Sequence, residues 1–282
     1  MSVINTNVKS LVAQNALTVN NRSLSKAMEQ LSTGKRINSA ADDAAGLAIS
    51  NKMTAQIRGL NQAVRNANDG ISMLQTAEGA TQEITNMLQR MRELAVQAAN
   101  DTYTAEDRSA LNAEVTALSA EITRIADNTE WNGMKLFIAA SAGSAGGIGT
   151  SGVVTLQVGT GGTSGNQFTV TLNDIDSTLG LSGISLTTSS GATSALSTLD
   201  DAIAAVDTDR ATFGATMNRL TYAIDNLTNI SQNAQASRSR IMDTDYAQAT
   251  TELARSQIIQ QAATAMLAQA NQAPQTVLTL LR

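Results

Sequence analysis

The chain has 282 residues, a formal net charge of −5, and neither cysteine nor histidine. Without these two residue types it has no disulfides, no thiolate nucleophile, no Cys or His metal site and no usual proton shuttle near pH 7. The acidic balance argues against a nucleic-acid-binding protein, while an enzyme that uses carboxylates or lysine stays open.

Composition favours close-packed helices over a bulky enzyme core. Apolar residues make up 42% of the chain, yet there are only three Phe, three Tyr and one Trp. The single proline, Pro274, leaves almost the whole chain free to be helical. The first residues lack the basic start and apolar run of a cleavable signal, and no apolar stretch approaches eighteen residues. On these grounds alone the chain looks cytosolic.

The first predicted helix carries leucines seven residues apart and should end at Gly34. Ser39 is expected to cap the next helix, with Asp42 and Asp43 in its positive first turn. The two carboxylates could instead form a metal or acid/base site, although no histidine is present to complete one. The predicted seam positions of this first helix are Leu17, Leu24, Met28 and Leu31.

Three further segments repeat apolar residues in alternating steps of three and four. The first runs from about Ala44 to Asn100, which as a helix would be about 85 Å long, too long for a globular domain to enclose. The second runs from Leu111 to Ile125, and the third from Leu199 to Leu227 with Arg210 as its one lapse. Sustained spacing of this kind predicts a seam facing another helix.

The middle of the chain, residues 139–194, is rich in Gly, Ser and Thr. Two β-branched runs, 153–158 and 167–172, are joined by a Gly-rich loop, which predicts a hairpin. Residues 184–188 are a candidate third strand. No phosphate-binding glycine motif accompanies the loop, so a surface hairpin is the preferred interpretation.

The last forty residues resume the heptad spacing, with polar or helix-breaking exceptions at Ser256, Gln260 and Pro274. We therefore predict a mainly α fold of long antiparallel coiled-coil helices with a small β-hairpin region. The alternative is a monomeric helical bundle in which every apolar seam is buried against another helix of the same chain. The predicted seam positions near this end are Met242, Tyr246, Leu253, Leu267, Val277 and Leu281.

Several stretches resemble bacterial flagellins of the short kind. The start, residues 2–7 followed by Gln14-Asn15, is similar to flagellin N-termini, and residues 31–49 (LSTGKRINSAADDAAGLAI) are similar to the family's most diagnostic stretch. Residues 66–72 and 89–100 also match, and residues 237–247 (SRSRIMDTDYA) resemble the signature before the terminal helix. Trp131-Asn132-Gly133 stands where the family usually has Phe-Asn-Gly.

The resemblance implies a structural subunit, with no cofactor, that polymerises into the extracellular flagellar filament used for motility. It implies an inner domain of paired terminal helices, residues 1–40 plus 240–282, and an outer domain, 41–239, with 139–194 as the hairpin insert. It also implies type III export without a cleaved signal peptide. The implied partners are the chain itself, the export apparatus and its C-terminal-binding chaperone, and the filament cap and hook-junction proteins.

The resemblance further implies recognition by the vertebrate Toll-like flagellin receptor. Arg90, Leu94 and Gln97 lie at i, i+4 and i+7, so one helical face would present a cation, an apolar anchor and an amide together. Glu114, on the following helix, matches the family's acidic partner position. The same face would contact neighbouring subunits. The predicted recognition and subunit-contact residues are Gln89, Arg90, Leu94, Gln97 and Glu114.

Three other functions are compatible with long helices of this kind. The first is a hook–filament junction protein with flagellin-like ends. The second is an enzyme carried on a filament scaffold, but the H-E-x-x-H motif of such inserts needs histidines that this chain lacks. The third is a cytoplasmic coiled-coil adaptor. Polymerisation of the purified protein on filament seeds would distinguish a flagellin from all three.

Overall fold

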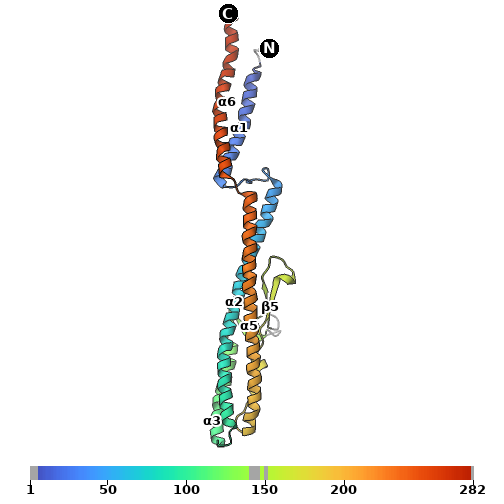
Figure 1. Cartoon of the computed structure of the whole chain (residues 1–282), viewed down its shortest axis with the longest axis vertical. Helices are drawn as coiled ribbons and strands as arrows, with labels where there is room; N and C mark the ends of the chain where they lie inside the picture. Colours follow the sequence, from blue (N-terminus) through green and yellow to red (C-terminus); the bar gives the residue numbers. More distant parts are fainter. Residues whose placement is uncertain (1–5, 140–146, 149–151, 281–282) are drawn as a thin grey trace. The chain divides into compact units, whose positions relative to one another are not determined.

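The computed structural model describes residues 6–139, 147–148 and 152–280, without the side chains of residues 138, 139, 147, 148, 176, 177 and 182 and those beyond residue 272. The chain divides into two compact units. The first unit is Met1–Ile57 with Gln232–Arg282, and the second is Arg58–Ser231. Each unit is described by itself below (Figure 1).

Five long helices dominate the described ranges, together with a short one, α4 (Ile175–Leu179). The heptad spacing predicted the long helices correctly. The helix predicted from Leu199 to Leu227 is longer at both ends than the spacing indicated, since α5 spans Ser189–Met242. The bounds of the long helices are α1 Val8–Thr33, α2 Ala44–Ala99, α3 Ala105–Asn128, α5 Ser189–Met242 and α6 Tyr246–Leu280.

Helix α1 begins and ends at residues suited to capping. The side chain of Asn7 accepts a hydrogen bond from the Ser10 N–H at 3.2 Å, which satisfies one of the free donors of the first turn. At the other end Gly34 is left-handed, with φ 68°, and its N–H donates to the Gln30 carbonyl at 2.9 Å. A left-handed residue after the last turn is a common role for glycine, so the predicted end of this helix is confirmed.

The start of α2 differs from the prediction, because Asp43 and not Ser39 caps the helix. The Gly46 N–H donates to Asp43 Oδ1 at 2.8 Å. Ser39 instead donates its N–H and its hydroxyl to Asp42 Oδ2, at 3.0 and 3.1 Å, and so closes a turn ahead of the helix. Asp42 Oδ1 also forms an ion pair with Lys26 Nζ at 2.9 Å. Both carboxylates therefore hold the backbone around the α1–α2 connection.

In the second unit α3 folds back along α2, and its first turn is closed by a capping box. The Thr104 hydroxyl accepts from the Asp107 N–H, and the Asp107 carboxylate accepts from the Thr104 N–H. The Asp107 carboxylate accepts from both the Thr104 N–H and the Thr104 hydroxyl, and these hydrogen bonds hold its pKa below the usual range. Thr104 caps the helix just after the 100–104 connection, where the chain reverses direction.

The Trp-Asn-Gly stretch forms a turn that leads into the β region. Asn132 and Gly133 both have positive φ, 52° and 75°, which is the geometry of a tight hairpin turn. The turn joins β1 (Glu130–Trp131) to β2 (Met134–Ala139), and β2 also pairs in parallel with β3 (Gly147–Ile148). The sequence did not predict this small three-stranded sheet.

The predicted hairpin is confirmed. Strand β4 (Val153–Gln157) pairs antiparallel with β5 (Gln167–Thr171), with Val153 opposite Thr171 and Gln157 opposite Gln167. The predicted third strand at 184–188 is wrong, since those residues are irregular and follow a short 3₁₀ turn. Leu186 there is fully buried, and its N–H donates to Asn112 Oδ1 of α3 at 2.7 Å. The side chain of Asn112 therefore accepts the backbone hydrogen bond that a neighbouring strand would otherwise have accepted. The predicted insert also covers 140–146 and 149–151, which lie outside the described residues.

The hairpin lies on α2 where two glycines leave room for it. A Cβ on Gly70 would collide with the Leu156 side chain, and one on Gly59 would come 2.8 Å from Thr160 Cγ2. Between them, Asn66 Nδ2 donates to the Gln157 carbonyl at 3.0 Å. Gly59 and Gly70 are eleven residues apart, about three helical turns, so they share one face of α2.

The core of the second unit is almost free of aromatics, as the composition predicted. The core is formed by residues of α2, α3 and α5 together with residues of the β region. Its two fully buried aromatic rings are those of Phe137 and Phe213. The cation of Arg219 lies 4.8 Å from the centre of the Phe168 ring, which ties β5 to α5. Fully buried aliphatic members include Leu74, Ile84, Leu88, Met91, Leu94, Ile122, Leu136, Leu172 and Leu186.

Candidate assembly and recognition surfaces

The first candidate surface is the pair of terminal helices, α1 and α6, which lie side by side in antiparallel orientation (Figure 1). Three long-range hydrogen bonds set their alignment, one of them from Gln260 Nε2 to Asn21 Oδ1 at 3.1 Å. Asn7 Nδ2 donates to the Ala270 carbonyl, and Asn20 Nδ2 donates to the Ser256 carbonyl, each at 2.8 Å. Asn20 and Ser256 are both buried, so the seam between the helices contains a satisfied polar pair.

The facing sides of the two helices follow a three-and-four spacing along their lengths. Most of the predicted leucines lie on this seam and are half-buried, which places them in contact within one chain. Whether they also act in assembly stays a prediction. Half-buried and buried seam residues are Ala13, Leu17, Asn20, Leu24, Ala27 and Leu31 of α1, and Ala249, Leu253, Ser256, Gln260, Ala263 and Leu267 of α6.

The other predicted seam positions lie elsewhere. Met28 is 56% exposed and Tyr246 is 57% exposed, so neither side chain is inside the seam. Met242 is half-buried but is the last residue of α5, and the non-helical residues 243–245 separate it from α6. The side chain of Val277 and the whole of Leu281 lie outside the described residues.

The connections at the base of this helix pair lie against each other. Lys35 and Asp243 form an antiparallel β-bridge, flanked by hydrogen bonds from the Arg36 N–H to the Met242 carbonyl (2.7 Å) and from the Thr244 N–H to the Gly34 carbonyl (3.0 Å). A Cβ on Gly34 would come within 2.8 Å of the Tyr246 hydroxyl. Glycine at 34 therefore serves both the helix end and this close approach.

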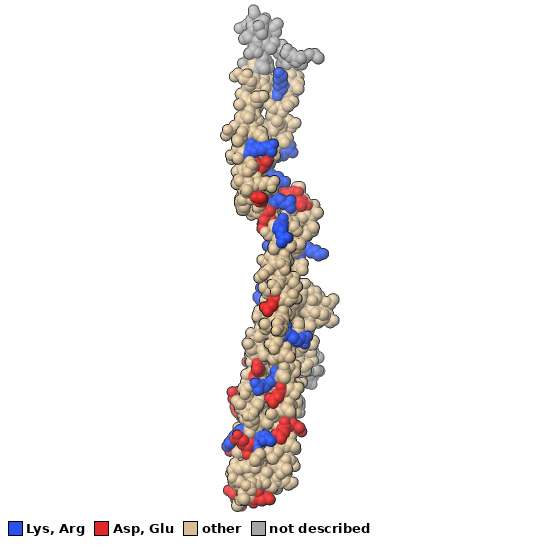
Figure 2. Space-filling model, viewed as in Figure 1, with Lys and Arg blue, Asp and Glu red and all other residues tan. Residues whose placement is uncertain are grey.

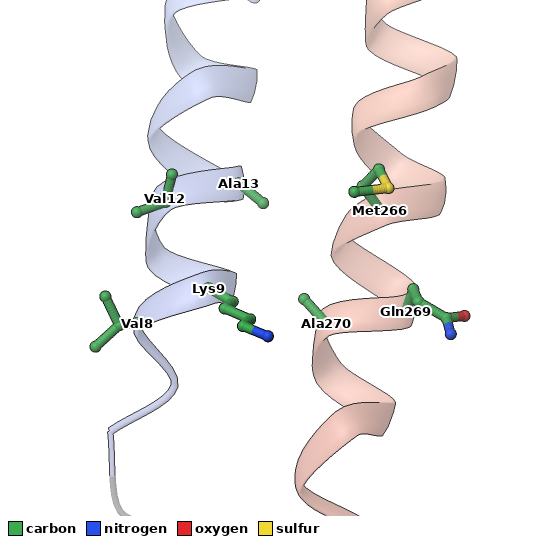
Figure 3. A pocket seen from close by; sticks show the side chains of 7 residues that line it. All are labelled: Val8, Lys9, Val12, Ala13, Met266, Gln269 and Ala270. Atoms are coloured by element: carbon green, nitrogen blue, oxygen red, sulfur yellow. The ribbon is translucent and has the colours of Figure 1, made fainter. Parts of the chain in front are cut away.

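The outer sides of α1 and α6 expose several large apolar side chains. No charged residue occurs from position 256 through 281, and on the face shown in Figure 2 the terminal helices carry few charged side chains. An open groove of about 460 Å³ runs between the helices, as Figure 3 shows. Its lining residues are Val8, Lys9, Val12, Ala13, Met266, Gln269 and Ala270. Further exposed aliphatic side chains on this pair are Leu11, Val19, Ile258 and Ile259.

The second candidate surface lies on α2 and α3 in the second unit. Arg90 Nε and Nη2 both donate to Glu114 Oε1, at 3.0 and 2.9 Å, and Nη1 donates to Glu93 Oε2 at 3.1 Å. The carboxylate of Glu114, followed by that of Glu93, raises the pKa of the Arg90 guanidinium. The structure therefore brings together the two predicted residues that the sequence placed on neighbouring helices. Gln89 and Gln97 are exposed beside them, and Gln97 Nε2 donates to the Tyr103 hydroxyl at 3.1 Å.

Leu94 does not belong to this surface. It is only 1% exposed and lies in the core, so the prediction that it is presented together with Arg90 and Gln97 is wrong. The spacing i, i+4 placed it one turn from Arg90, but α3 and α5 cover that side of α2. The apolar residue that the face does present is Val96, which is 52% exposed.

Sequence reasoning also missed an ion pair on the other side of this exposed strip. Arg92 Nε lies 2.6 Å from Asp200 Oδ1 of α5, and the carboxylate raises the pKa of Arg92 while Arg92 lowers that of Asp200. A shallow groove lined by Gln89, Arg92, Glu93 and Val96 lies beside it. The two partners are 108 positions apart, so no local spacing could have paired them.

Comparison with known proteins identifies the family. The model of the bacterial flagellin N-terminal helical region matches residues 4–142, and that of the C-terminal helical region matches residues 196–281. A flagellin of Halalkalibacterium halodurans is 46% identical over 99% of this chain and all of its own. Polar flagellin F of Vibrio parahaemolyticus is 39% identical over 99% of both chains. This chain belongs to the flagellin family.

Solved structures agree with this assignment. The crystal structure of Bacillus cereus flagellin is 32% identical, with a TM-score of 0.51, and the match covers 62% of this flagellin and 94% of that chain. A putative flagellar hook-associated protein of Vibrio parahaemolyticus has a TM-score of 0.58 over 72% of this chain. Its sequence identity is only 16%, so that likeness concerns the fold alone.

As a flagellin, the chain is a structural subunit of the extracellular flagellar filament, and the family is not one of enzymes. Flagellins polymerise with copies of themselves. Nothing in the comparisons favours the hook-junction alternative over this one. Among the described residues no helix is long and apolar enough to cross a membrane.

Proposed function

We propose that the α1–α6 pair is the assembly element through which this flagellin builds the filament core. The observation that carries the proposal is the set of large apolar side chains that the pair exposes, namely Val8, Leu11, Val12, Val19, Ile258, Ile259 and Met266. Soluble monomers rarely expose long apolar surfaces of this kind, and such surfaces usually mark contacts with other chains.

The proposed occupant of this face is a second copy of the same chain. The family is one of self-assembling subunits, and the ends of the chain offer two helices whose apolar residues exceed what their own seam can bury. In this proposal residues 1–40 with 240–282 form the inner domain and 41–239 the outer domain, with 139–194 as its insert. Contacts within the chain divide the units at 57 and 232, which is compatible with an inner domain whose edges extend into α2 and α5.

The same apolar face suits the partners that meet the subunit before it assembles. We propose that the flagellar export apparatus carries the chain out without cleaving a signal peptide, and that a chaperone covers α6 until then. The filament cap and the hook-junction proteins would meet the ends as the subunit is incorporated. An exposed helix with only two charges, Glu252 and Arg255, before residue 282 would be prone to association if it were left free.

We further propose that the α2–α3 surface is recognised by the vertebrate Toll-like flagellin receptor. Arg90 is held in position by Glu114 and Glu93, so it presents its remaining surface with little freedom to lose on binding. Arginine is among the residues that most often dominate binding energy in interfaces. Gln89 and Gln97 extend the polar contact area on both sides of it, and Leu94 supports the helix from beneath.

Seeded polymerisation tests the assembly proposal. The full chain should elongate filament seeds, whereas a chain that ends after Met242 should not, because α1 then lacks its partner helix. A charge placed on the outer face, Ile258→Glu, should also block elongation, while Gln261→Glu on an already polar position serves as the matched control. Normal elongation by Ile258→Glu would count against this face as the contact between subunits.

A further inference from the structure

The groove between α1 and α6 contains a sulfur atom that chemistry could alter. Met266 is 66% exposed and lines this groove from α6, while Val8, Val12 and Ala13 line it from α1 (Figure 3). The chain has ten methionines and no cysteine, so the thioethers are its only oxidisable sulfur groups. Met73 and Met91, in contrast, are buried in the core of the second unit.

We propose that Met266 is an oxidation site that controls assembly: its conversion to the sulfoxide in the free subunit blocks elongation, and incorporation into the filament protects it. This inference rests on the proposed function, because it needs the groove to be covered by another subunit. The oxidant is a peroxide. The peroxide must reach the sulfur in order to react with it. In the free chain the open groove leaves the sulfur accessible.

The reaction is a two-electron oxygen transfer. A lone pair of the Met266 sulfur attacks one oxygen of hydrogen peroxide, an S–O bond forms, and the O–O bond breaks. The leaving hydroxide takes the proton of the transferred oxygen and departs as water. The sulfur is oxidised and the peroxide is reduced. A flexible apolar side chain becomes a polar one, and methionine sulfoxide reductases can reverse the change with a thiol reductant.

The surroundings of Met266 explain why this change would matter. The groove is lined by aliphatic side chains and contains only Lys9 and Gln269 as polar neighbours. The sulfoxide oxygen is a hydrogen-bond acceptor that loses its hydration when the groove is covered, and the lining offers only Lys9 and Gln269 as replacement donors, so its burial is unfavourable. The same oxygen in the exposed groove of the free subunit stays hydrated, so the penalty arises only on assembly.

The test uses two variants of the full chain in which Met28, the other exposed methionine of the helix pair, is replaced by leucine. One adds Met266→Leu, and the other adds Met134→Leu on β2 of the second unit, where the native side chain is 38% exposed. Leucine keeps the apolar volume but cannot be oxidised. Both are treated with hydrogen peroxide and added to filament seeds, and peptide mass spectrometry reports each sulfoxide.

We expect peroxide to slow elongation about tenfold in the variant that retains Met266, because the sulfoxide oxygen then loses its hydration as the groove is covered. The Met266→Leu variant should elongate as before, and reductase treatment should restore the other one. The proposal would be overturned if peroxide slowed both variants equally, or if it slowed neither variant. In assembled filaments Met266 should be oxidised far more slowly than in free subunits. Equal rates of oxidation would contradict the proposal that assembly protects it.

An untreated Met266→Gln variant separates this inference from the proposed function, since glutamine places a polar group in the groove without oxidation. If this variant elongates normally, the groove is not a buried assembly surface and both proposals fail. If it elongates poorly while peroxide leaves Met266 unmodified in the free subunit, the assembly role stands and the oxidation proposal alone fails.

Discussion

Arg90 and Leu94 lie one turn apart on α2, yet they belong to opposite environments. Arg90 is exposed and bound to Glu114, whereas Leu94 is buried among core residues. A loss of receptor activation after either substitution would therefore have two different causes. Arg90 would act by direct contact, and Leu94 through the stability of the helices that present Arg90.

We predict that Arg90→Ala weakens receptor activation by the free subunit without unfolding it, because its side chain contributes little burial. Leu94→Ala should lower the free energy of unfolding by about 2–5 kcal/mol, the usual cost of truncating a buried leucine. Leu94→Met, which nearly conserves volume, should leave both activation and folding close to normal. Denaturant unfolding and a receptor reporter assay measure the two effects. A Leu94→Ala chain of full stability that fails to activate would show that Leu94 makes direct contact.

Asp42 gives the first unit a predicted dependence on pH. The ion pair with Lys26, followed by hydrogen bonds from Ser39 and Asn38, holds the pKa of this carboxyl well below its usual range. A carboxyl whose pKa is lower in the folded state stabilises that state at every pH above its unfolded value of about 3.9. The stabilisation is lost as pH falls from there through the folded pKa.

We therefore expect the first unit to lose stability in acid below about pH 4, partly through protonation of Asp42. Asp42→Asn should be less stable than the native chain at pH 7, and the difference should shrink as the pH is lowered. An NMR titration of the Asp42 carboxyl checks the cause directly, and Lys26→Met should move its pKa upward. Titration of Asp42 at the ordinary aspartate value in the native chain would contradict the prediction.

At the scale of elements, two glycines of α2 allow a matched comparison. Gly79 is exposed, and a Cβ there would meet no atom within 4 Å, whereas a Cβ on Gly70 would collide with Leu156 of the hairpin. Gly79→Ala should stabilise the second unit by about 0.5–1 kcal/mol, the gain usual for a helix interior. Gly70→Ala gains the same propensity but must displace the Leu156 side chain, so its net effect should be clearly smaller. Thermal unfolding gives the difference, and equal stabilisation by both would show that the hairpin does not depend on this gap.

Much of the fold could be predicted because heptad spacing is a property of each helix alone. The Leu17, Leu24 and Leu31 repeat and the long run after Ala44 predicted helices without reference to their partners. The hairpin was equally local, since two β-branched runs and a glycine loop specify it. The end of α1 at Gly34 followed from the conformational freedom of one residue.

What could not be predicted depends on contacts between distant parts of the chain. Leu186 avoids a strand because Asn112, 74 positions away, supplies its hydrogen-bond partner. Leu94 has a spacing that suits an exposed face, and only the cover provided by other helices places it in the core. At the α2–α3 surface the resemblance indicated Arg90 and Glu114, which form an ion pair in the structure, but no pattern pointed to Arg92 with Asp200.

At the scale of the whole molecule, the two units differ in how they bury apolar residues. The second unit encloses a continuous core of leucine, isoleucine and phenylalanine. Among the described side chains of α6, only Ala249 and Ser256 are buried, and its larger aliphatic residues are half-buried or exposed. An isolated helix pair of this kind has few contacts to offset the loss of conformational entropy.

We therefore predict that the terminal helices of the free subunit open far more readily than the second unit does. Helices with little tertiary burial are marginal in water, and local opening is easiest where buried apolar contacts are few. Amide hydrogens of α1 and of α6 from Tyr246 to Leu267 should exchange rapidly in the free subunit, while those of the core positions of α2 and α5 stay protected. In the filament the same amides of α1 and α6 should become protected, because neighbouring copies would then cover their outer faces. A chain truncated after Met242 provides the control, since its second unit should keep the exchange pattern of the full chain. Protection of Tyr246–Leu267 in the free subunit as strong as that of α2 would contradict the prediction, and it would mean that the α1–α6 seam is sufficient to fold the ends before assembly.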